Sequence, residues 1–133
     1  MKIIQVKTKR RTQLVDITNE VQRVVSASGV TTGTCLLYVP HTTAGILINE
    51  HADSDVASDA EGALDRLIPF EGPYRHAEGN SDSHVKTMLS GMNQFVFVQD
   101  GKLALGRWQG IFLAEFDGPR ERQLYIKVLG DRA

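Results

Sequence analysis

The sequence lacks paired cysteines, an excess of charge of either sign and any long apolar run. Its single cysteine, Cys35, excludes an intramolecular disulfide and a cysteine-rich zinc site. With 15 Lys and Arg against 16 Asp and Glu, the chain lacks the basic field that broad binding to nucleic acid or anionic membranes requires. Its apolar runs are far shorter than the roughly 20 residues that a membrane helix needs. We therefore expect a cytoplasmic protein with no nucleic acid and no membrane among its partners.

The hydrophobic content of the chain is sufficient for one domain over residues 1–133. Hydrophobic residues make up 41% of the chain. A folded chain of this length buries roughly two-thirds of the surface that its unfolded state exposes, so a core can form without disulfides. No linker, internal repeat or low-complexity tract indicates a second domain.

Hydrophobic spacing predicts a series of short strands interrupted by helices. The predicted strands cover 2–8, 12–16, 32–39, 45–49, 94–98, 103–105, 109–115 and 123–129. Three helices are predicted: from Ile17 to a stop at Gly29, over 53–67 up to Pro69, and a short one before Gly91. The expected N-caps are Asp16 or Thr18 for the first helix and Asp82 or Ser83 for the third. The order ββ-α-ββ-α-α-ββββ leaves few parallel crossovers, which predicts a compact α+β fold with layered, largely antiparallel sheets.

Histidines in or beside irregular segments are the first candidates for chemistry. His41 lies between two predicted strands, His76 lies in the long polar loop over 69–82, and His84 lies near a helix start. Three imidazoles suit zinc and leave one position for water or substrate. The alternative is that they are surface histidines that only form hydrogen bonds. His51, in an acidic stretch, is expected to be structural.

Three further clusters each allow two interpretations. The acids over 50–59 could hold magnesium beside a phosphate, but a solvated helix N-terminus is the better interpretation. The segment 78–84 either receives an anion at a helix start or forms an ordinary turn. Arg120, just after the Asp117-Gly118 turn, has the planar fork that suits a phosphate or carboxylate. Trp108 is expected to pack in the core or at a subunit interface.

Taken in order, these polar blocks strongly resemble those of the YjbQ family, also called the secondary thiamine-phosphate synthase family. The matching blocks are HTTAG at 41–45 with INE at 48–50, DSDV at 53–56 with Asp59, HAEGN at 76–80 with His84, LGRWQ at 105–109 and EFDGPR at 115–120. The resemblance covers nearly the whole chain. No single block is specific, but the set is.

The resemblance implies a compact α+β fold and a homotrimer with pockets near the subunit boundaries. It also implies a weak thiamine-phosphate synthase activity, in which hydroxymethylpyrimidine diphosphate and thiazole phosphate join and diphosphate is released. Metal binding through the histidines is plausible for the family.

These inferences combine into one hypothesis for the site. A divalent metal ion is expected, either zinc held by the metal ligands His41, His76 and His84 or magnesium that accompanies the diphosphate. The residues expected to line the pocket around a small phosphorylated metabolite are Asn49, Glu50, Asn80, Asp82, Gln109 and Arg120. Two alternatives stay open, namely another metal-dependent enzyme, such as a hydrolase of a small phosphorylated metabolite, and a non-catalytic trimer that binds a small ligand.

Overall fold

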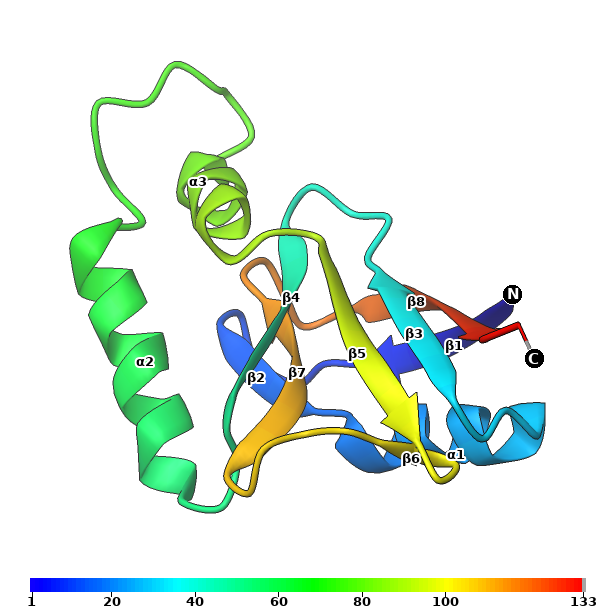
Figure 1. The fold of residues 1–133 in the computed structure, drawn as a ribbon. Helices are drawn as coiled ribbons and strands as arrows, with labels where there is room; N and C mark the ends of the chain where they lie inside the picture. The colour runs from blue at the N-terminus through cyan, green and yellow to red at the C-terminus, as the bar shows by residue number, and fades with distance from the viewer. Residues whose placement is uncertain (133) are drawn as a thin grey trace.

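Two antiparallel sheets with three helices around them form the part of the chain that the computed structural model describes, residues 1–132 (Figure 1). The strands are β1 (Lys2–Lys7), β2 (Gln13–Asp16), β3 (Gly33–Tyr38), β4 (Ala44–Glu50), β5 (Asn93–Gln99), β6 (Lys102–Leu103), β7 (Gln109–Glu115) and β8 (Glu121–Gly130). The helices are α1 (Thr18–Ser28), α2 (Ser54–Leu67) and α3 (Ser81–Ser90). The predicted α+β class and order of elements are confirmed.

One sheet has five strands in the order β1-β8-β3-β5-β6, and the other has three in the order β2-β7-β4. The core lies between them because strand alternation directs one face of each inward. In β3, Cys35 and Leu37 are buried, whereas Leu36 and Tyr38 point to the outer face. Burial raises the pKa of the Cys35 thiol to about 11, so this residue acts as the small hydrophobe that the sequence predicts.

Helix α1 covers the core with Val21 and Val25 and ends at Gly29, whose positive φ of 73° suits glycine. Its N-cap position is occupied by Ile17, which has no polar side chain. The prediction that Asp16 or Thr18 is the N-cap is therefore wrong by one residue. The carboxylate of Asp16 accepts a hydrogen bond from the Thr18 backbone N–H at 3.0 Å from just outside the N-cap position.

Helix α2 stands at one side of the molecule and contains no buried residue (Figure 1). Asp53 caps it by accepting a hydrogen bond from the Asp55 N–H, and the helix ends just before Pro69 as predicted. Two acidic side chains hold it to the neighbouring segments. Glu61 accepts a hydrogen bond from the Leu14 N–H at 2.8 Å, and Asp65 accepts one from the Lys86 ammonium at 2.7 Å.

The N-cap of helix α3 is Asn80 rather than Asp82 or Ser83, so the predicted N-cap is wrong. Both predicted residues lie within the first turn and are buried, because tertiary partners take their polar groups. The Arg11 guanidinium binds Asp82, and the Ser83 hydroxyl donates to the Phe116 carbonyl. Sequence reasoning detects local caps but not partners this far apart in the chain.

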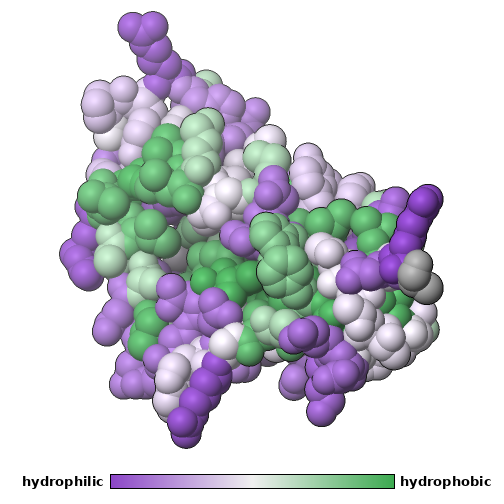
Figure 2. Space-filling view, viewed as in Figure 1, coloured by the Kyte–Doolittle hydropathy of each residue, from purple (hydrophilic) through white to green (hydrophobic). Residues whose placement is uncertain are grey.

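The outer face of the five-stranded sheet is apolar and uncovered. Its exposed hydrophobic side chains are Ile3, Leu36, Tyr38, Phe95, Phe97 and Leu129. Figure 2 shows hydrophobic side chains gathered in the area of β5, and again over α3 and the neighbouring end of α2. Among the helices of residues 1–132, none has the length and apolar composition needed to cross a bilayer.

Candidate functional site

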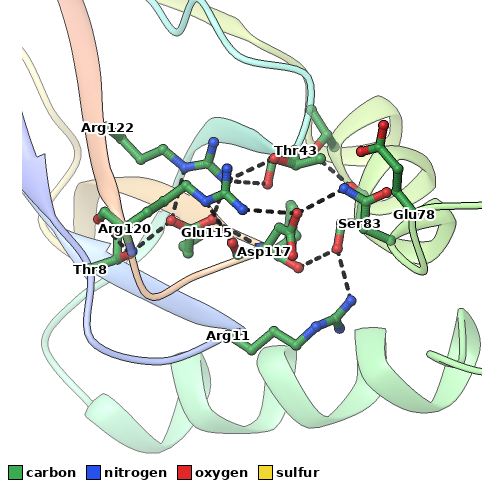
Figure 3. A network of polar contacts seen from close by, with 12 residues as sticks. Thr8, Arg11, Thr43, Glu78, Ser83, Glu115, Asp117, Arg120 and Arg122 are labelled. Atoms are coloured by element: carbon green, nitrogen blue, oxygen red, sulfur yellow. Dashed lines mark hydrogen bonds and ion pairs between the residues drawn. The ribbon is translucent and has the colours of Figure 1, made fainter.

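A buried ion pair lies at the end of the three-stranded sheet where β7 leads into β8 (Figure 3). Glu115 is fully buried, and Arg122 is 3% exposed. The guanidinium donates to both carboxylate oxygens of Glu115, through Nε at 2.9 Å and through Nη2. The Thr8 hydroxyl lies 2.8 Å from one of these oxygens, and the Asp117 N–H donates to the other. Because every oxygen of this carboxylate has a partner, the pair fixes the loops around it, and removal of either residue would leave a buried charge unpaired.

The same guanidinium fixes the segment that follows β3. Arg122 Nη2 donates to the Thr43 hydroxyl at 2.8 Å and lies 3.2 Å from the Thr43 carbonyl oxygen. Thr43 is buried, and the backbone around it passes directly into β4. The loop that carries His41 is thereby held against β8.

A cavity of about 550 Å³ opens beside this network. Its lining residues are Tyr38, Val39, Pro40, His41, Thr42, Thr43, Met92, Arg120 and Arg122. Among the described residues, two arginines and no Asp or Glu line it. A cavity of this size accommodates a small metabolite, and its two guanidinium groups are donors that suit an anionic one.

His41 is held as a neutral imidazole at this cavity. Its Nε2 accepts a hydrogen bond from the Gln123 backbone N–H at 2.9 Å. Burial lowers the pKa of His41 below its ordinary value, and the positive charge of Arg122 lowers it further. A neutral ring whose Nε2 accepts a hydrogen bond carries its proton on Nδ1. The lone pair of the neutral ring is then taken by the Gln123 N–H, so His41 in this arrangement does not fit the role of a metal ligand.

Arg120 connects the cavity to the start of α3. Its side chain is 51% exposed, and it donates to the Asp117 carbonyl at 2.9 Å and to the Asp117 carboxylate at 3.2 Å. The same carboxylate accepts a hydrogen bond from Asn80 Nδ2 at 2.9 Å. The side-chain oxygen of Asn80, Oδ1, is buried and has no hydrogen-bond partner within residues 1–132. Arg120 and Asn80 thus share the carboxylate of Asp117, and Arg120 also lines the cavity.

His76 and His84 lie next to each other, with ring centroids 5.4 Å apart in an edge-to-face arrangement. His76 Nε2 is 3.8 Å from the Glu78 carboxylate. In the part of the chain that the structure describes, no three His, Cys, Asp or Glu side chains are placed to hold one metal ion. The three predicted ligands therefore do not form a complete metal site within one chain, and metal binding stays a prediction.

The remaining predicted residues do not share this cavity. Gln109 pairs with Glu50 at one end of the β4–β7 ladder, whereas Ala44 pairs with Glu115 at the other. Six residue steps separate these ends, which is about 20 Å at the usual strand rise. Asn49 and Glu50 instead line a second, smaller pocket. Asp82 is buried, and its carboxylate is taken up by Arg11 and Lys86.

Sequence reasoning missed the ion pair itself, although a signal for it exists. Arg122 alternates with Leu124 and Ile126, which are both buried, so period-two spacing places its side chain on the inward face of β8. A buried arginine needs a carboxylate, and Glu115 ends the apolar run of β7. The alternation predicts the burial of Arg122, but only the folded chain identifies its partner.

Fold and cavity define a small α+β protein with an arginine-lined pocket beside a buried ion pair, and comparison with known proteins gives the family. The chain belongs to the family described as UPF0047 protein YjbQ-like, which matches residues 2–131. The UPF0047 protein MJ1081 of Methanocaldococcus jannaschii is 52% identical over 128 residues, covering 96% of this chain and 93% of that protein. YugU of Bacillus subtilis is 48% identical over 131 residues, covering 98% and 99%.

The fold is shared with solved members of the family. A crystal structure of a YjbQ/UPF0047 family protein from Clostridium acetobutylicum aligns with a TM-score of 0.95 at 46% identity, covering 97% of this chain and 100% of that one. The family resemblance of the sequence is confirmed. The names of these relatives specify no activity.

Proposed function

We propose that this protein binds a small phosphorylated metabolite in the cavity at His41. One observation carries the proposal, namely that Arg120, Arg122 and a neutral imidazole line the same cavity of about 550 Å³ with no carboxylate in the lining formed by the described residues. Phosphate oxygens accept hydrogen bonds only, and a lining rich in donors matches them.

The two arginines have different roles. Arg122 is committed to Glu115 and Thr43, and moving it would leave a buried carboxylate without its counter-charge. Arg120 is half exposed, and its partner Asp117, which is 18% exposed, keeps a hydrogen bond from Asn80 Nδ2 when Arg120 turns away. Arg120 is therefore the group that turns to a phosphate, and Nδ1–H of His41 is a second donor.

The reaction that we propose is the weak coupling of hydroxymethylpyrimidine diphosphate with thiazole phosphate. The thiazole nitrogen forms a bond to the pyrimidine methylene carbon, and the C–O bond to diphosphate breaks with its electron pair on the leaving oxygen. Arg120 would stabilise the charge that develops on this oxygen, and the cavity would hold the two reactants in line. The divalent ion stays a prediction, and no step here depends on it.

The alternatives receive different support. A hydrolase that uses metal-bound water needs a ligand set that one chain does not assemble within residues 1–132. A non-catalytic ligand-binding protein uses the same pocket and differs only in the absence of turnover.

We also propose that the functional unit is a homotrimer whose contacts include the apolar outer face of the five-stranded sheet. Phe95 and Phe97 on this face are 58% and 60% exposed. Tyr38 belongs both to this face and to the cavity lining, so a second copy on the face would wall off the cavity. Light scattering should give about three times the chain mass of 14.7 kDa. A monomer would contradict this.

The test of the function is calorimetric binding of thiamine phosphate, together with an assay of its synthesis. Arg120→Gln removes a charged donor from the cavity and should weaken binding about 10- to 100-fold, the equivalent of about 1.5–3 kcal/mol. Arg107→Gln is the matched control, because Arg107 stacks on Trp108 away from the cavity lining. Product formed only with both substrates supports the transferase, and binding without product supports the ligand-binding alternative. Equal binding by both variants would contradict the site.

A further inference from the structure

A second pocket, of about 150 Å³, lies between α2 and the three-stranded sheet. Its lining residues are Leu14, Leu47, Asn49, Glu50, Val56, Ala57, Ala60, Leu64 and Phe112. Seven of the nine are apolar, and all three strands of the small sheet contribute to the floor. The pocket is partly open to solvent, since Val56 in its lining is 37% exposed, and its volume suits a ligand of the size of benzene.

Polar contacts attach α2 to the segments beside the pocket. Glu61 and Asp65 attach the helix to Leu14 N–H, Arg10, Thr12 and Lys86. These contacts involve the C-terminal half of the helix. The N-terminal half contributes Val56, Ala57 and Ala60 to the pocket, and two alanines on this face leave the space unfilled.

The polar end of the pocket carries a negative charge. Glu50 is partly buried at the end of β4, and within residues 1–132 its carboxylate has no hydrogen bond or ion pair. The side-chain oxygen of its neighbour Asn49 accepts a hydrogen bond from the Glu50 N–H at 2.7 Å. The side-chain NH₂ group of Asn49 takes no part in this bond. A carboxylate beside an apolar cavity matches a ligand with a cationic end and a compact apolar body.

We propose that the α2 pocket binds a small organic cation, a compact ring or branched alkyl group that bears a primary ammonium, with the ammonium paired to Glu50. The inference goes beyond the proposed function and does not depend on it. The pocket lies at the opposite end of β4 from Thr43 and His41, about 20 Å away by the strand rise.

The experiment uses benzylamine as the probe and follows the backbone amides of Ala57 and Ala60 by NMR. Benzylamine should shift them saturably, with a dissociation constant on the order of 1 mM for so small a molecule. Benzoate has the same ring and the opposite charge, and it should cause no saturable shift. Glu50→Gln should weaken benzylamine binding about tenfold or more, because it removes the charge from the pair.

Two variants test the apolar part of the pocket. Ala60→Leu fills the space and should abolish binding while the protein stays folded. Ala63→Leu makes the same change at an exposed position of α2 outside the lining, and it should bind like the unaltered protein. If Ala60→Leu fails to fold, Ala57→Val fills part of the same space.

Three results would overturn the proposal. These are the absence of saturable shifts up to about 20 mM benzylamine, far above the expected constant, equal binding of benzoate, and unchanged binding by the filled variant. None of them bears on thiamine phosphate binding at Arg120, so the two sites fail or stand separately.

Discussion

At one end of the three-stranded sheet the carboxylate of Glu115 is fully buried, whereas at the other end the carboxylate of Glu50 is partly exposed and without a partner in residues 1–132. Both residues end neighbouring strands, β7 and β4. Glu115 has Arg122, Thr8 and the Asp117 N–H around it. Glu50 borders an apolar pocket.

The difference separates two uses of the same side chain. A buried carboxylate with all its acceptor positions filled gives up its reactivity and fixes the loops of a site, which leaves ligand contact to its half-exposed neighbour Arg120. An unpaired carboxylate at a pocket keeps its charge available for a ligand. Neutralising the carboxylates of Glu115 and Glu50 in separate variants distinguishes the structural role from the ligand-binding role.

The largest effect is expected for Glu115→Gln. The change leaves the Arg122 guanidinium buried without its counter-charge, which should lower the free energy of unfolding by about 3–5 kcal/mol. Glu50→Gln, the matched change at the open end, should alter it by less than about 0.5 kcal/mol. Urea unfolding at pH 7 measures both. Similar losses in the two variants would remove the distinction between the ends.

A smaller difference is expected between two glycines at the same ends of the ladder. A Cβ on Gly45 would meet the Gly91 carbonyl oxygen at 2.3 Å, and this backbone atom cannot turn away. A Cβ on Gly110 would meet the His51 ring at 2.3 Å, but this partly exposed side chain can swing out.

Gly45→Ala should therefore destabilise the protein by about 2–3 kcal/mol. Gly110→Ala should cost about 1 kcal/mol through loss of the hydrogen bond between His51 and Asp16. In a His51→Ala background the cost of Gly110→Ala should vanish. Thermal unfolding of Gly45→Ala, Gly110→Ala, His51→Ala and the double variant of the last two provides the check. If Gly110→Ala still destabilises the protein in the absence of the His51 side chain, the backbone itself is strained at this position.

The same comparison shows what sequence can predict. Elements were predictable where the signal is local: period-two strands such as β7, and the helix that Asp53 caps and Pro69 follows. The N-cap of α3 was not, because Asp82 looks like a cap locally but binds Arg11, 71 residues away in the chain. The family blocks contain Arg120, Asn80 and His41, which the structure places near one end of the sheet.

The family blocks did not separate this end of the three-stranded sheet from the opposite end. Asn49, Glu50 and Gln109 are polar and close to the same blocks in sequence, and only the antiparallel register places them at the far end of β4 and β7. Register depends on pairings between distant segments, which one sequence does not reveal. For the same reason three histidines in loops suggest a metal site, although the fold brings only His76 and His84 together.

The smallest effect concerns His41, whose pKa reports the positive charge at the paired end. Burial lowers this pKa below the usual value of about 6.5, and Arg122 and Arg120 lower it further. Arg120→Gln removes one of these charges, so the pKa should rise toward 6.5, while Arg107→Gln should leave it unchanged. A ¹⁵N-resolved NMR titration measures it, and the neutral form should show the proton on Nδ1.

The direction of the His41 pKa shift also determines how stability depends on pH. Because folding lowers the pKa of His41, the unfolded chain binds this proton more readily, and stability falls as the pH drops below about 6.5 and through the folded pKa. His41→Gln should flatten this part of the profile between about pH 7 and pH 5. A His41 pKa above 6.5 would instead mean that the carboxylate of Glu115 outweighs burial and the two arginines, and that this end of the sheet is not prepared for an anion.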